Sequence, residues 1–210
     1  MSRPLAVLRP EPGNAATAAR IAALGLTAIP LPLFAVTPLP WVAPDPAGYD
    51  ALLITSANAI RHGGPALARY RHVPVYAVGE ASAAAARAAG FAIADVGRGG
   101  AEAIVARAGG RRLLHFAGRD RHDSGVDAVA VYASDALDVD AAPLTGSVAL
   151  VHSARAAARL GGIVHDRTSI ALAANSLGAA RAAGDGWAAL ALAAEPTDAG
   201  LIDAARGLAD

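Results

Sequence analysis

Short apolar runs alternate with alanine-rich runs along most of this chain, and this alternation limits the possible fold more than any other feature. Residues 5–8 and 51–54 have the length and composition of buried strands, whereas residues 14–24 and 81–89, each followed by glycine, are typical of helices. Further strands are predicted at 26–33, 75–78, 91–95, 112–116 and 126–132. Strands that alternate with helices form parallel sheets covered by helices, so we expect an α/β protein.

An internal repeat predicts two similar α/β domains. Residues 51–61 are echoed by 148–158, and residues 75–85 by 170–180, with strand, serine and helix in the same order each time. Residues 29–34 and 126–132 precede the two copies, and we expect them to cross between the domains. The first 36 residues hold too few strands to form a domain alone. We therefore expect one discontinuous domain from 1–36 and 135–210, a second from 37–134, and a cleft between them.

Composition excludes several classes of chemistry. The chain has no cysteine, and all 18 of its basic residues are arginine, so thiol nucleophiles, cysteine-bound metals, lysine Schiff bases and a nucleotide-binding P-loop are excluded. The six histidines have no spacing typical of a metal site. Eighteen acidic residues balance the arginines, so no overall charge favours nucleic acid or an anionic membrane.

The chain shows no sign of export or membrane insertion. The uncharged stretch 21–44 is long enough to span a bilayer, but its repeated prolines are incompatible with a continuous helix. The first residues lead directly into a predicted strand, without an apolar signal segment. We expect a cytoplasmic monomer whose partner is a small molecule, with no nucleic acid and no membrane.

Candidate binding groups follow the predicted strands. Ligands of parallel α/β sheets bind beyond the carboxyl ends of the strands, near the amino ends of the following helices. Five strand–helix junctions carry suitable residues, at 9–13, 55–58, 79–82, 152–155 and 175–176. Each hydroxyl in them can cap a helix, bind a ligand, or do both.

Three further side chains are candidates at strand ends. Arg9 and Arg119 follow predicted strands and can bind carboxylates, although solvated surface arginines are equally consistent with the sequence. Tyr132 ends an expected crossing strand, where its phenol can donate a proton or simply pack.

A glycine-rich run at 97–102 resembles half of a dinucleotide-binding fingerprint, but Glu102 occupies the position of the last small residue. A nucleotide-dependent oxidoreductase is thus one alternative. Another is a two-domain α/β protein that binds or converts a different anionic small molecule.

Scattered motifs over nearly the whole chain resemble one known family. They are Val7-Leu-Arg-Pro10, Leu53-Ile-Thr-Ser-Ala-Asn-Ala59, Tyr76-Ala-Val-Gly-Glu-Ala-Ser-Ala83, Phe116-Ala-Gly-Arg-Asp120, Val131-Tyr132, Val151-His-Ser153 and Glu195-Pro-Thr197. In order and spacing they are similar to uroporphyrinogen-III synthase, an enzyme of tetrapyrrole and heme biosynthesis.

The resemblance implies two parallel-sheet α/β domains joined by a two-stranded β-ladder, with the active site in the interdomain cleft. It implies a cofactor-independent lyase that takes hydroxymethylbilane, a linear tetrapyrrole with eight carboxylates, removes its terminal hydroxyl as water and closes the ring with the last pyrrole inverted. Unassisted closure gives the uninverted isomer I instead.

The resemblance also implies roles for individual residues. Tyr132 matches the best candidate for the catalytic acid. The substrate carboxylates are expected to bind at Arg9, Thr55, Ser56, Ser82, Arg119, Ser153, Ser176 and Thr197. No cofactor and no metal are expected.

Two positions and one segment depart from the family pattern. Leu8 replaces a common threonine, and Ala174 replaces a frequent glycine. Only a short segment around 119–127 separates two strands that usually flank a full helix, which predicts a trimmed middle domain.

Overall fold

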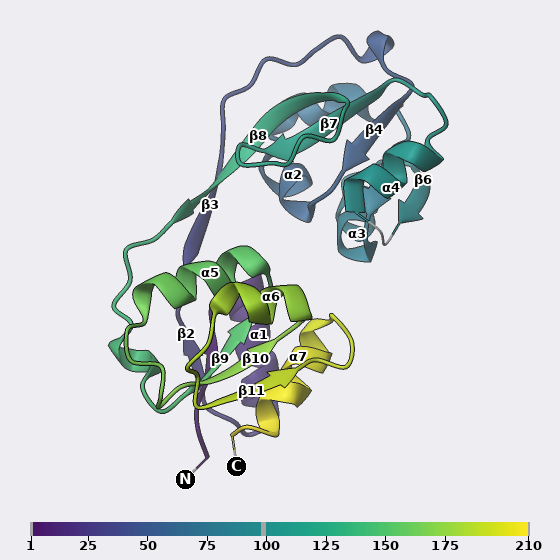
Figure 1. Ribbon diagram of the computed structural model, residues 1–210. Helices are drawn as coiled ribbons and strands as arrows, with labels where there is room; N and C mark the ends of the chain where they lie inside the picture. Colours follow the sequence, from purple (N-terminus) through teal and green to yellow (C-terminus); the bar gives the residue numbers. More distant parts are fainter. Residues whose placement is uncertain (1, 98–99, 210) are drawn as a thin grey trace. The chain divides into compact units, whose positions relative to one another are not determined.

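The computed structural model describes residues 2–97 and 100–209, and the chain divides into two compact units. Unit 1 comprises Met1–Ala35 and Ala136–Asp210, and unit 2 comprises Val36–Asp135. Strands and helices alternate through both units (Figure 1), which confirms the predicted α/β class with two parallel-dominant sheets.

Unit 1 contains a five-stranded sheet in the order β11-β10-β9-β1-β2. Its strands are β1 (Leu5–Val7), β2 (Ala28–Pro30), β9 (Val148–Val151), β10 (Ala171–Ala174) and β11 (Ala189–Leu192). Every neighbouring pair is parallel. The chain first adds β2 on one side of β1 and then adds β9, β10 and β11 on the other, so the order reverses between β1 and β9.

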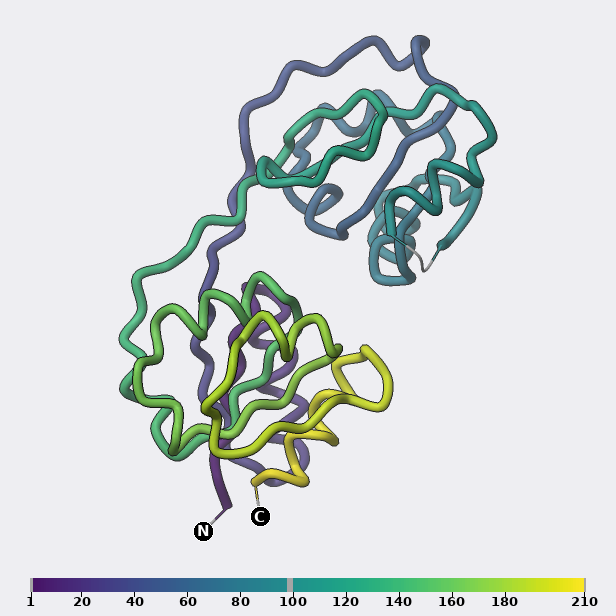
Figure 2. The backbone as a smooth tube through the Cα atoms, in the orientation of Figure 1, coloured from purple at the N-terminus to yellow at the C-terminus, as the bar shows by residue number. Residues whose placement is uncertain are grey.

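Helices cover both faces of this sheet. The helices α1 (Gly13–Ala23) and α7 (Asp198–Arg206) pack on one face, and α5 (Ala154–Ile163) and α6 (Leu177–Ala183) on the other. A short 3₁₀ turn, Ala142–Leu144, precedes β9. The two chain ends meet in this unit, where the Arg3 amide donates to the Ala209 carbonyl at 2.8 Å (Figure 2).

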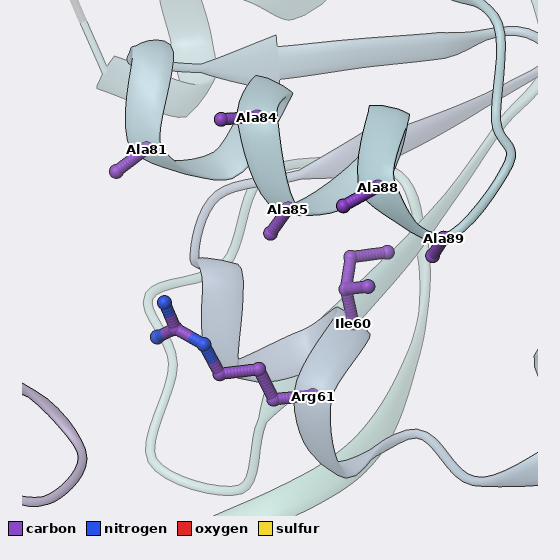
Figure 3. A pocket seen from close by; sticks show the side chains of 7 residues that line it. All are labelled: Ile60, Arg61, Ala81, Ala84, Ala85, Ala88 and Ala89. Atoms are coloured by element: carbon purple, nitrogen blue, oxygen red, sulfur yellow. The ribbon is translucent and has the colours of Figure 1, made fainter.

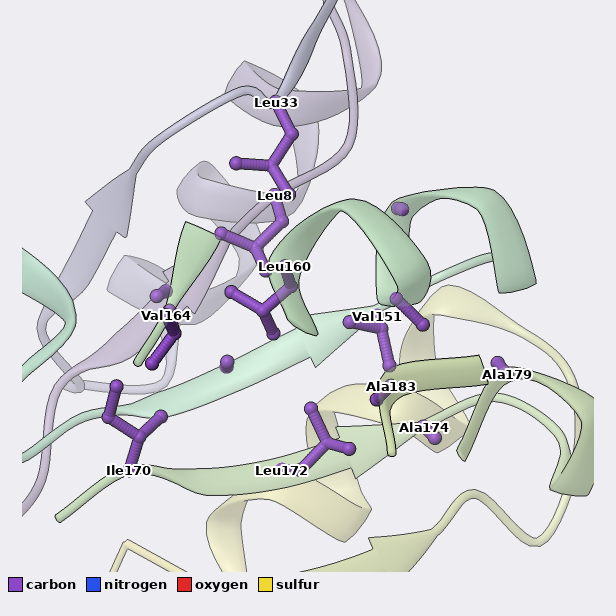
Figure 4. Close-up of a cluster of buried hydrophobic side chains, with 14 of the residues drawn as sticks. Leu8, Leu33, Val151, Leu160, Val164, Ile170, Leu172, Ala174, Ala179 and Ala183 are labelled. Carbon is purple, nitrogen blue, oxygen red and sulfur yellow. The ribbon is translucent and has the colours of Figure 1, made fainter. Parts of the chain in front are cut away.

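Small residues bring α5 and α6 close together in the core of unit 1. Leu160 and Leu172 fill the space between sheet and helices, and the alanines Ala179 and Ala183 complete the cluster (Figure 4). A Cβ on Gly161 would lie 2.6 Å from the Ala183 carbonyl oxygen, so the two helices touch backbone to backbone there. The alanine-rich composition therefore gives a tightly packed core with short distances between elements.

Unit 2 contains a six-stranded sheet in the order β3-β8-β7-β4-β5-β6. The strands are β3 (Phe34–Pro38), β4 (Ala51–Ile54), β5 (Val75–Val78), β6 (Ile93–Gly97), β7 (Leu113–Gly118) and β8 (Asp127–Ala136). The helices α2 (Ala57–His62) and α3 (Glu80–Ala88) and a 3₁₀ helix, Pro65–Tyr70, cover one face, and α4 (Gly100–Arg107) covers the other. A further 3₁₀ turn, Pro46–Gly48, precedes β4.

The strands β3 and β8 form the ladder that links the two units in sequence. The Leu39 amide donates to Val131 and the Leu137 amide donates to Leu33, both at 3.0 Å, which is the pattern of an antiparallel pair. The first crossing strand lies at Phe34–Pro38 and not at 29–34 as expected. Residues 28–30 instead pair with β1 at the sheet edge, where Pro30 needs no amide hydrogen for a ladder bond.

The proline-rich segment after β3 packs on unit 2. The Trp41 ring centroid lies 5.3 Å from that of Phe116, and its indole N–H donates to the Gly63 carbonyl at 2.9 Å. The buried Tyr70 donates its hydroxyl to the Pro44 carbonyl at 2.6 Å. The connection from β7 to β8 contains no helix over residues 119–126, as the short spacing predicted.

Arg167 holds the carboxyl ends of α5 and α6 together. Its guanidinium donates to the carbonyls of Gly161 (2.5 Å), Val164 (3.3 Å), Ala183 (3.2 Å) and Asp185 (2.9 Å), and it lies 5.0 Å from the Trp187 ring centroid. A planar five-donor group satisfies several helix-end carbonyls at once, which an ammonium cannot do in the same geometry.

We predict that Arg167→Lys lowers the free energy of unfolding by about 1–3 kcal/mol, because partly buried carbonyls lose their donors although the charge is kept. Urea unfolding followed by circular dichroism measures this loss. The matched control is Arg181→Lys on the exposed face of α6, which should change stability little. Equal losses in the two variants would contradict the role of the hydrogen bonds.

Candidate functional site

The three hydroxyls predicted at the carboxyl edge of the unit 1 sheet all cap helices. Ser153 accepts from the Ala156 amide, Ser176 from the Ala179 amide and Thr197 from the Gly200 amide, at 3.1–3.2 Å. All three residues are exposed, so each hydroxyl can still donate its own hydrogen outward. Capping and ligand binding are thus compatible here.

The three hydroxyls predicted in unit 2 play different parts. Ser56 caps α2 and accepts from the Asn58 amide at 3.2 Å. The capping interpretation is wrong for Ser82, because α3 begins after Gly79, whose φ of 79° suits glycine, and Ser82 is already buried in the first turn. It is also wrong for Thr55, whose hydroxyl lies 2.9 Å from the His115 ring.

His115 joins Thr55 to the shortened connection between β7 and β8. Its Nε2 lies 2.9 Å from the Thr55 hydroxyl and its Nδ1 lies 3.1 Å from the Ser124 hydroxyl. Burial, with a smaller contribution from the positive charge of Arg121, lowers the pKa of His115 to about 4. The ring is therefore neutral near pH 7, with one nitrogen donating and the other accepting.

Tyr132 lies against a bare glycine at the end of β7. It faces Gly118 in the register of β7 and β8, and a Cβ on that glycine would lie 2.9 Å from Cζ of the phenol ring. The prediction that Tyr132 ends its strand is wrong, because β8 continues to Ala136. Among the described residues, the Tyr132 hydroxyl has no hydrogen-bond partner, so it is free to donate to a ligand.

Arg119 follows β7 beside Tyr132. Its backbone amide donates to the Tyr132 carbonyl at 2.8 Å, and its exposed guanidinium pairs with Asp135 and, at 3.5 Å, with Asp120. The hydrogen bond and charge of Asp135, followed by the charge of Asp120, raise the pKa of Arg119. In unit 2 the carboxyl ends of parallel strands are followed by Thr55, Ser56, Ser82 and Arg119, and Tyr132 of β8 lies beside the carboxyl end of β7.

Arg9 lies in a polar cluster at the carboxyl edge of unit 1. Its Nη1 donates to the Asp198 carboxylate at 3.2 Å and lies 3.5 Å from the Thr17 hydroxyl. The His152 Nε2 lies 2.8 Å from the same carboxylate. Burial, partly offset by the hydrogen bond to Asp198, lowers the pKa of His152, so this imidazole is neutral near pH 7.

Asp198 is the centre of that cluster. Burial alone would raise its pKa, but hydrogen bonds from Thr17, His152 and Arg20 together lower it. Asp198 was not among the predicted site residues, because an acidic residue after a Thr cap is typical of a helix start. The contacts of His115 and His152 were not predicted, because their partners Thr55 and Asp198 lie 60 and 46 residues away, respectively.

Other predicted features lie elsewhere. Arg98 and Gly99 of the glycine-rich run are outside the described residues, and Glu102 lies in the first turn of α4. A groove of about 560 Å³ runs between α2 and α3, lined by Ile60, Arg61 and alanines (Figure 3), and none of the predicted site residues lines it.

The part of the chain that the structure describes contains neither a metal-binding group of side chains nor a membrane-spanning helix. No three His, Asp or Glu side chains in residues 2–97 and 100–209 are grouped so that they could hold a metal ion. Within the same ranges, no helix has the length and apolarity needed to cross a membrane. The expected cleft between the units stays a prediction.

We predict that the stability of unit 2 falls steeply with acidification because of His115. In the unfolded chain this histidine takes up a proton near pH 6.5, but in the fold only near pH 4, so stability is lost as the pH falls through this interval. The difference between these two pKa values corresponds to a loss of about 3 kcal/mol in the free energy of unfolding. His115→Gln, which cannot titrate, should flatten this part of the curve.

The measurement uses urea unfolding between pH 4 and 7, followed by Trp41 fluorescence in a Trp187→Phe background, since Trp41 packs in unit 2. His72→Gln, a change at an exposed histidine of the same unit, is the control and should keep the slope. An unchanged slope in His115→Gln would assign the titration to another group.

Comparisons with known proteins give one consistent result. A family model described as uroporphyrinogen-III synthase HemD matches residues 15–203. A search of curated proteins finds no match. Two solved structures align over nearly the whole chain, each with 16% identity.

The first is a uroporphyrinogen-III synthetase from Helicobacter pylori, with a TM-score of 0.69 over 99% of this chain and 100% of the other. The second is a mutant uroporphyrinogen III synthase from the extremely thermophilic bacterium Thermus thermophilus, with a TM-score of 0.60 over 99% of both chains. At this identity the structures establish the shared fold, whereas the family model covers most of the sequence. The chain therefore belongs to the uroporphyrinogen-III synthase family, enzymes of porphyrin synthesis.

Proposed function

We propose that this chain, as a cytoplasmic monomer, cyclises hydroxymethylbilane to uroporphyrinogen III with no metal or coenzyme, and that Tyr132 is its catalytic acid. One observation carries the role of Tyr132 as the acid. Its hydroxyl has no hydrogen-bond partner among the residues that the structure describes, and it lies beside Arg119 at the carboxyl edge of the unit 2 sheet. Family membership supports the reaction as a whole.

The substrate's carboxylates match the donors at the strand ends. Arg9 and Arg119 supply charge, and the hydroxyls of Thr55, Ser56, Ser82, Ser153, Ser176 and Thr197 supply neutral hydrogen bonds. A chain with no net charge binds an octa-anion through such local groups. The amino ends of α5, α6 and α7 favour the same negative charge.

The chemical step needs an acid before it needs a base. Protonation of the terminal hydroxyl by Tyr132 lets the carbon–oxygen bond break, and water leaves while the pyrrole nitrogen delocalises the positive charge. The substituted α-carbon of the last ring attacks this electrophile and gives a spiro intermediate. The bond from that α-carbon to its methylene bridge then breaks, and the bridge carbon bonds to the free α-carbon, which closes the ring with the last pyrrole inverted. The proton lost when the last ring regains aromaticity restores the phenol, so the residue ends the cycle as it began.

Nothing favours the alternative of a different anionic small molecule. That hypothesis uses the same arginines and hydroxyls but assigns no role to the Tyr132 phenol. The isomer composition of the product distinguishes the two, because only ring inversion yields isomer III.

We predict that the purified protein converts hydroxymethylbilane predominantly to isomer III without any added metal or coenzyme. The chain has neither cysteine nor lysine, so covalent catalysis through a thiol or an amine is excluded. Oxidation of the product and separation of uroporphyrins I and III provide the measurement. Activity that is lost after chelation and restored by a metal ion would contradict the cofactor-free mechanism.

We predict that Tyr132→Phe lowers the rate by a factor on the order of 10²–10⁴, the usual effect of losing a general acid, and shifts the product toward isomer I. The ring and its contact with Gly118 remain, so the melting temperature should change little. Tyr76→Phe removes a hydroxyl from a buried ring on β5 and serves as the control. Wild-type rate and isomer ratio in Tyr132→Phe would exclude this residue as the acid.

A further inference from the structure

The polar cluster around Asp198 lies where the strand order of unit 1 reverses. Arg9 follows β1 and His152 follows β9, which are the two neighbouring strands on either side of the reversal. In open parallel sheets the crevice beyond such a reversal is the usual place for a ligand. The helices α1 and α7 pack on the same face, so Thr17 and Arg20 reach the start of α7 as well.

Four side chains from three segments converge on one carboxylate. Asp198 Oδ1 accepts from the Thr17 hydroxyl at 2.7 Å and the Arg9 Nη1 at 3.2 Å and lies 2.8 Å from His152, and Oδ2 accepts from Arg20 at 2.5 Å. The Asp198 side chain is 17% exposed. With a neutral imidazole, two arginines against one carboxylate leave one positive charge in the cluster.

Only part of the Arg9 guanidinium is used by these contacts. Its Nη1 is held, whereas among the described residues neither Nε nor Nη2 has a hydrogen-bond partner. This half of the group lies against the bare start of α1, where a Cβ on Gly13 would be 2.7 Å from Cζ and 2.9 Å from Nη2. The Asn14 amide, donating to the carbonyls of Val7 (2.6 Å) and Arg9 (2.9 Å), fixes the backbone on which Arg9 stands.

We propose that Asp198 is a positioning residue, which holds Arg9 by Nη1 so that its Nε–Nη2 edge binds a substrate carboxylate. Two adjacent N–H groups in one plane fit a carboxylate in bidentate fashion. The identity of the carboxylate as part of the tetrapyrrole rests on the proposed function. Asp198 itself does not touch the substrate, and it acts through the direction it gives to Arg9.

A purely structural role for Asp198 makes a different prediction. Asp198 also ties α7 to α1, so its loss on that view would lower stability and the active fraction of protein while binding by folded molecules stays the same. Positioning instead predicts weaker binding by folded protein, and an effect that depends on the presence of Arg9.

The test measures the Kd of uroporphyrin III, an octacarboxylate probe, by calorimetry, together with KM, kcat and isomer ratio. Asp198→Asn keeps the size of the side chain but removes its charge. Gly13→Ala leaves Asp198 untouched and displaces the Nε–Nη2 half of Arg9. Asp203→Asn, the same chemical change at an exposed site on α7, is the control.

We expect Kd and KM to rise about ten-fold in Asp198→Asn, Gly13→Ala and Arg9→Ala, with kcat nearly unchanged and no change in the control. Adding Asp198→Asn to Arg9→Ala should weaken binding no further. An unchanged Kd in folded Asp198→Asn or Gly13→Ala would overturn the proposal. So would a double variant whose rise in Kd is the product of the rises in Asp198→Asn and Arg9→Ala. If Asp198→Asn does not fold, Gly13→Ala decides.

Failure of the proposed function gives a separate result. A wild-type protein that yields only isomer I refutes the synthase activity, but the Kd series still tests the positioning of Arg9. A wild-type protein that yields isomer III with equal Kd values throughout the series refutes the positioning alone.

Discussion

Parallel pairing of strands determines where the candidate binding groups of this protein gather. When neighbouring strands run in the same direction, their carboxyl ends meet at one edge, and each following helix begins there with free amide groups. In unit 1 this edge collects Arg9 after β1, His152 and Ser153 after β9, and Ser176 after β10, although β1 is far from the other two strands in sequence. The polar residues lie there because the strands themselves are completely buried and have room only for apolar side chains.

The two units share one arrangement of five parallel strands, but the first strand along the chain occupies a different place in each sheet. The order β2-β1-β9-β10-β11 in unit 1 corresponds to β8-β7-β4-β5-β6 in unit 2, so the repeated pairs β9–β10 and β4–β5 occupy the same places. Arg9 after β1 then corresponds to Arg119 after β7, and Ser153 after β9 to Ser56 after β4. Both units therefore offer an arginine and a helix-capping serine beside the reversal of strand order, which suits a ligand with many carboxylates.

Sequence patterns predicted the features that depend on local order. The strand–serine–helix repeat predicted Ser56, Ser153 and Ser176 at helix starts, and the short segment 119–127 predicted the missing helix. The first crossing was misplaced because residues 26–33 and 34–38 form one apolar run, and only pairing with β1 separates them. For Ser82, only the capping interpretation was wrong, because Gly79, with its φ of 79°, precedes the first residue of α3, and this conformation is a property of the fold.

Contacts between distant segments could not be inferred from local patterns. In both units these contacts determine the partners and the charge states of the buried polar side chains. Asp198 and Arg9 are 189 residues apart, and an aspartate behind a threonine cap has a sufficient local explanation. His115 lies in an apolar strand, where a single histidine gives no sign that Thr55 and Ser124 will contact its two nitrogens. In each case a buried polar group needs partners, and the chain supplies them from wherever the parallel topology brings hydroxyls and charges within reach. The shortened connection after β7 follows the same rule, since the Ser124 hydroxyl lies 3.1 Å from the His115 Nδ1.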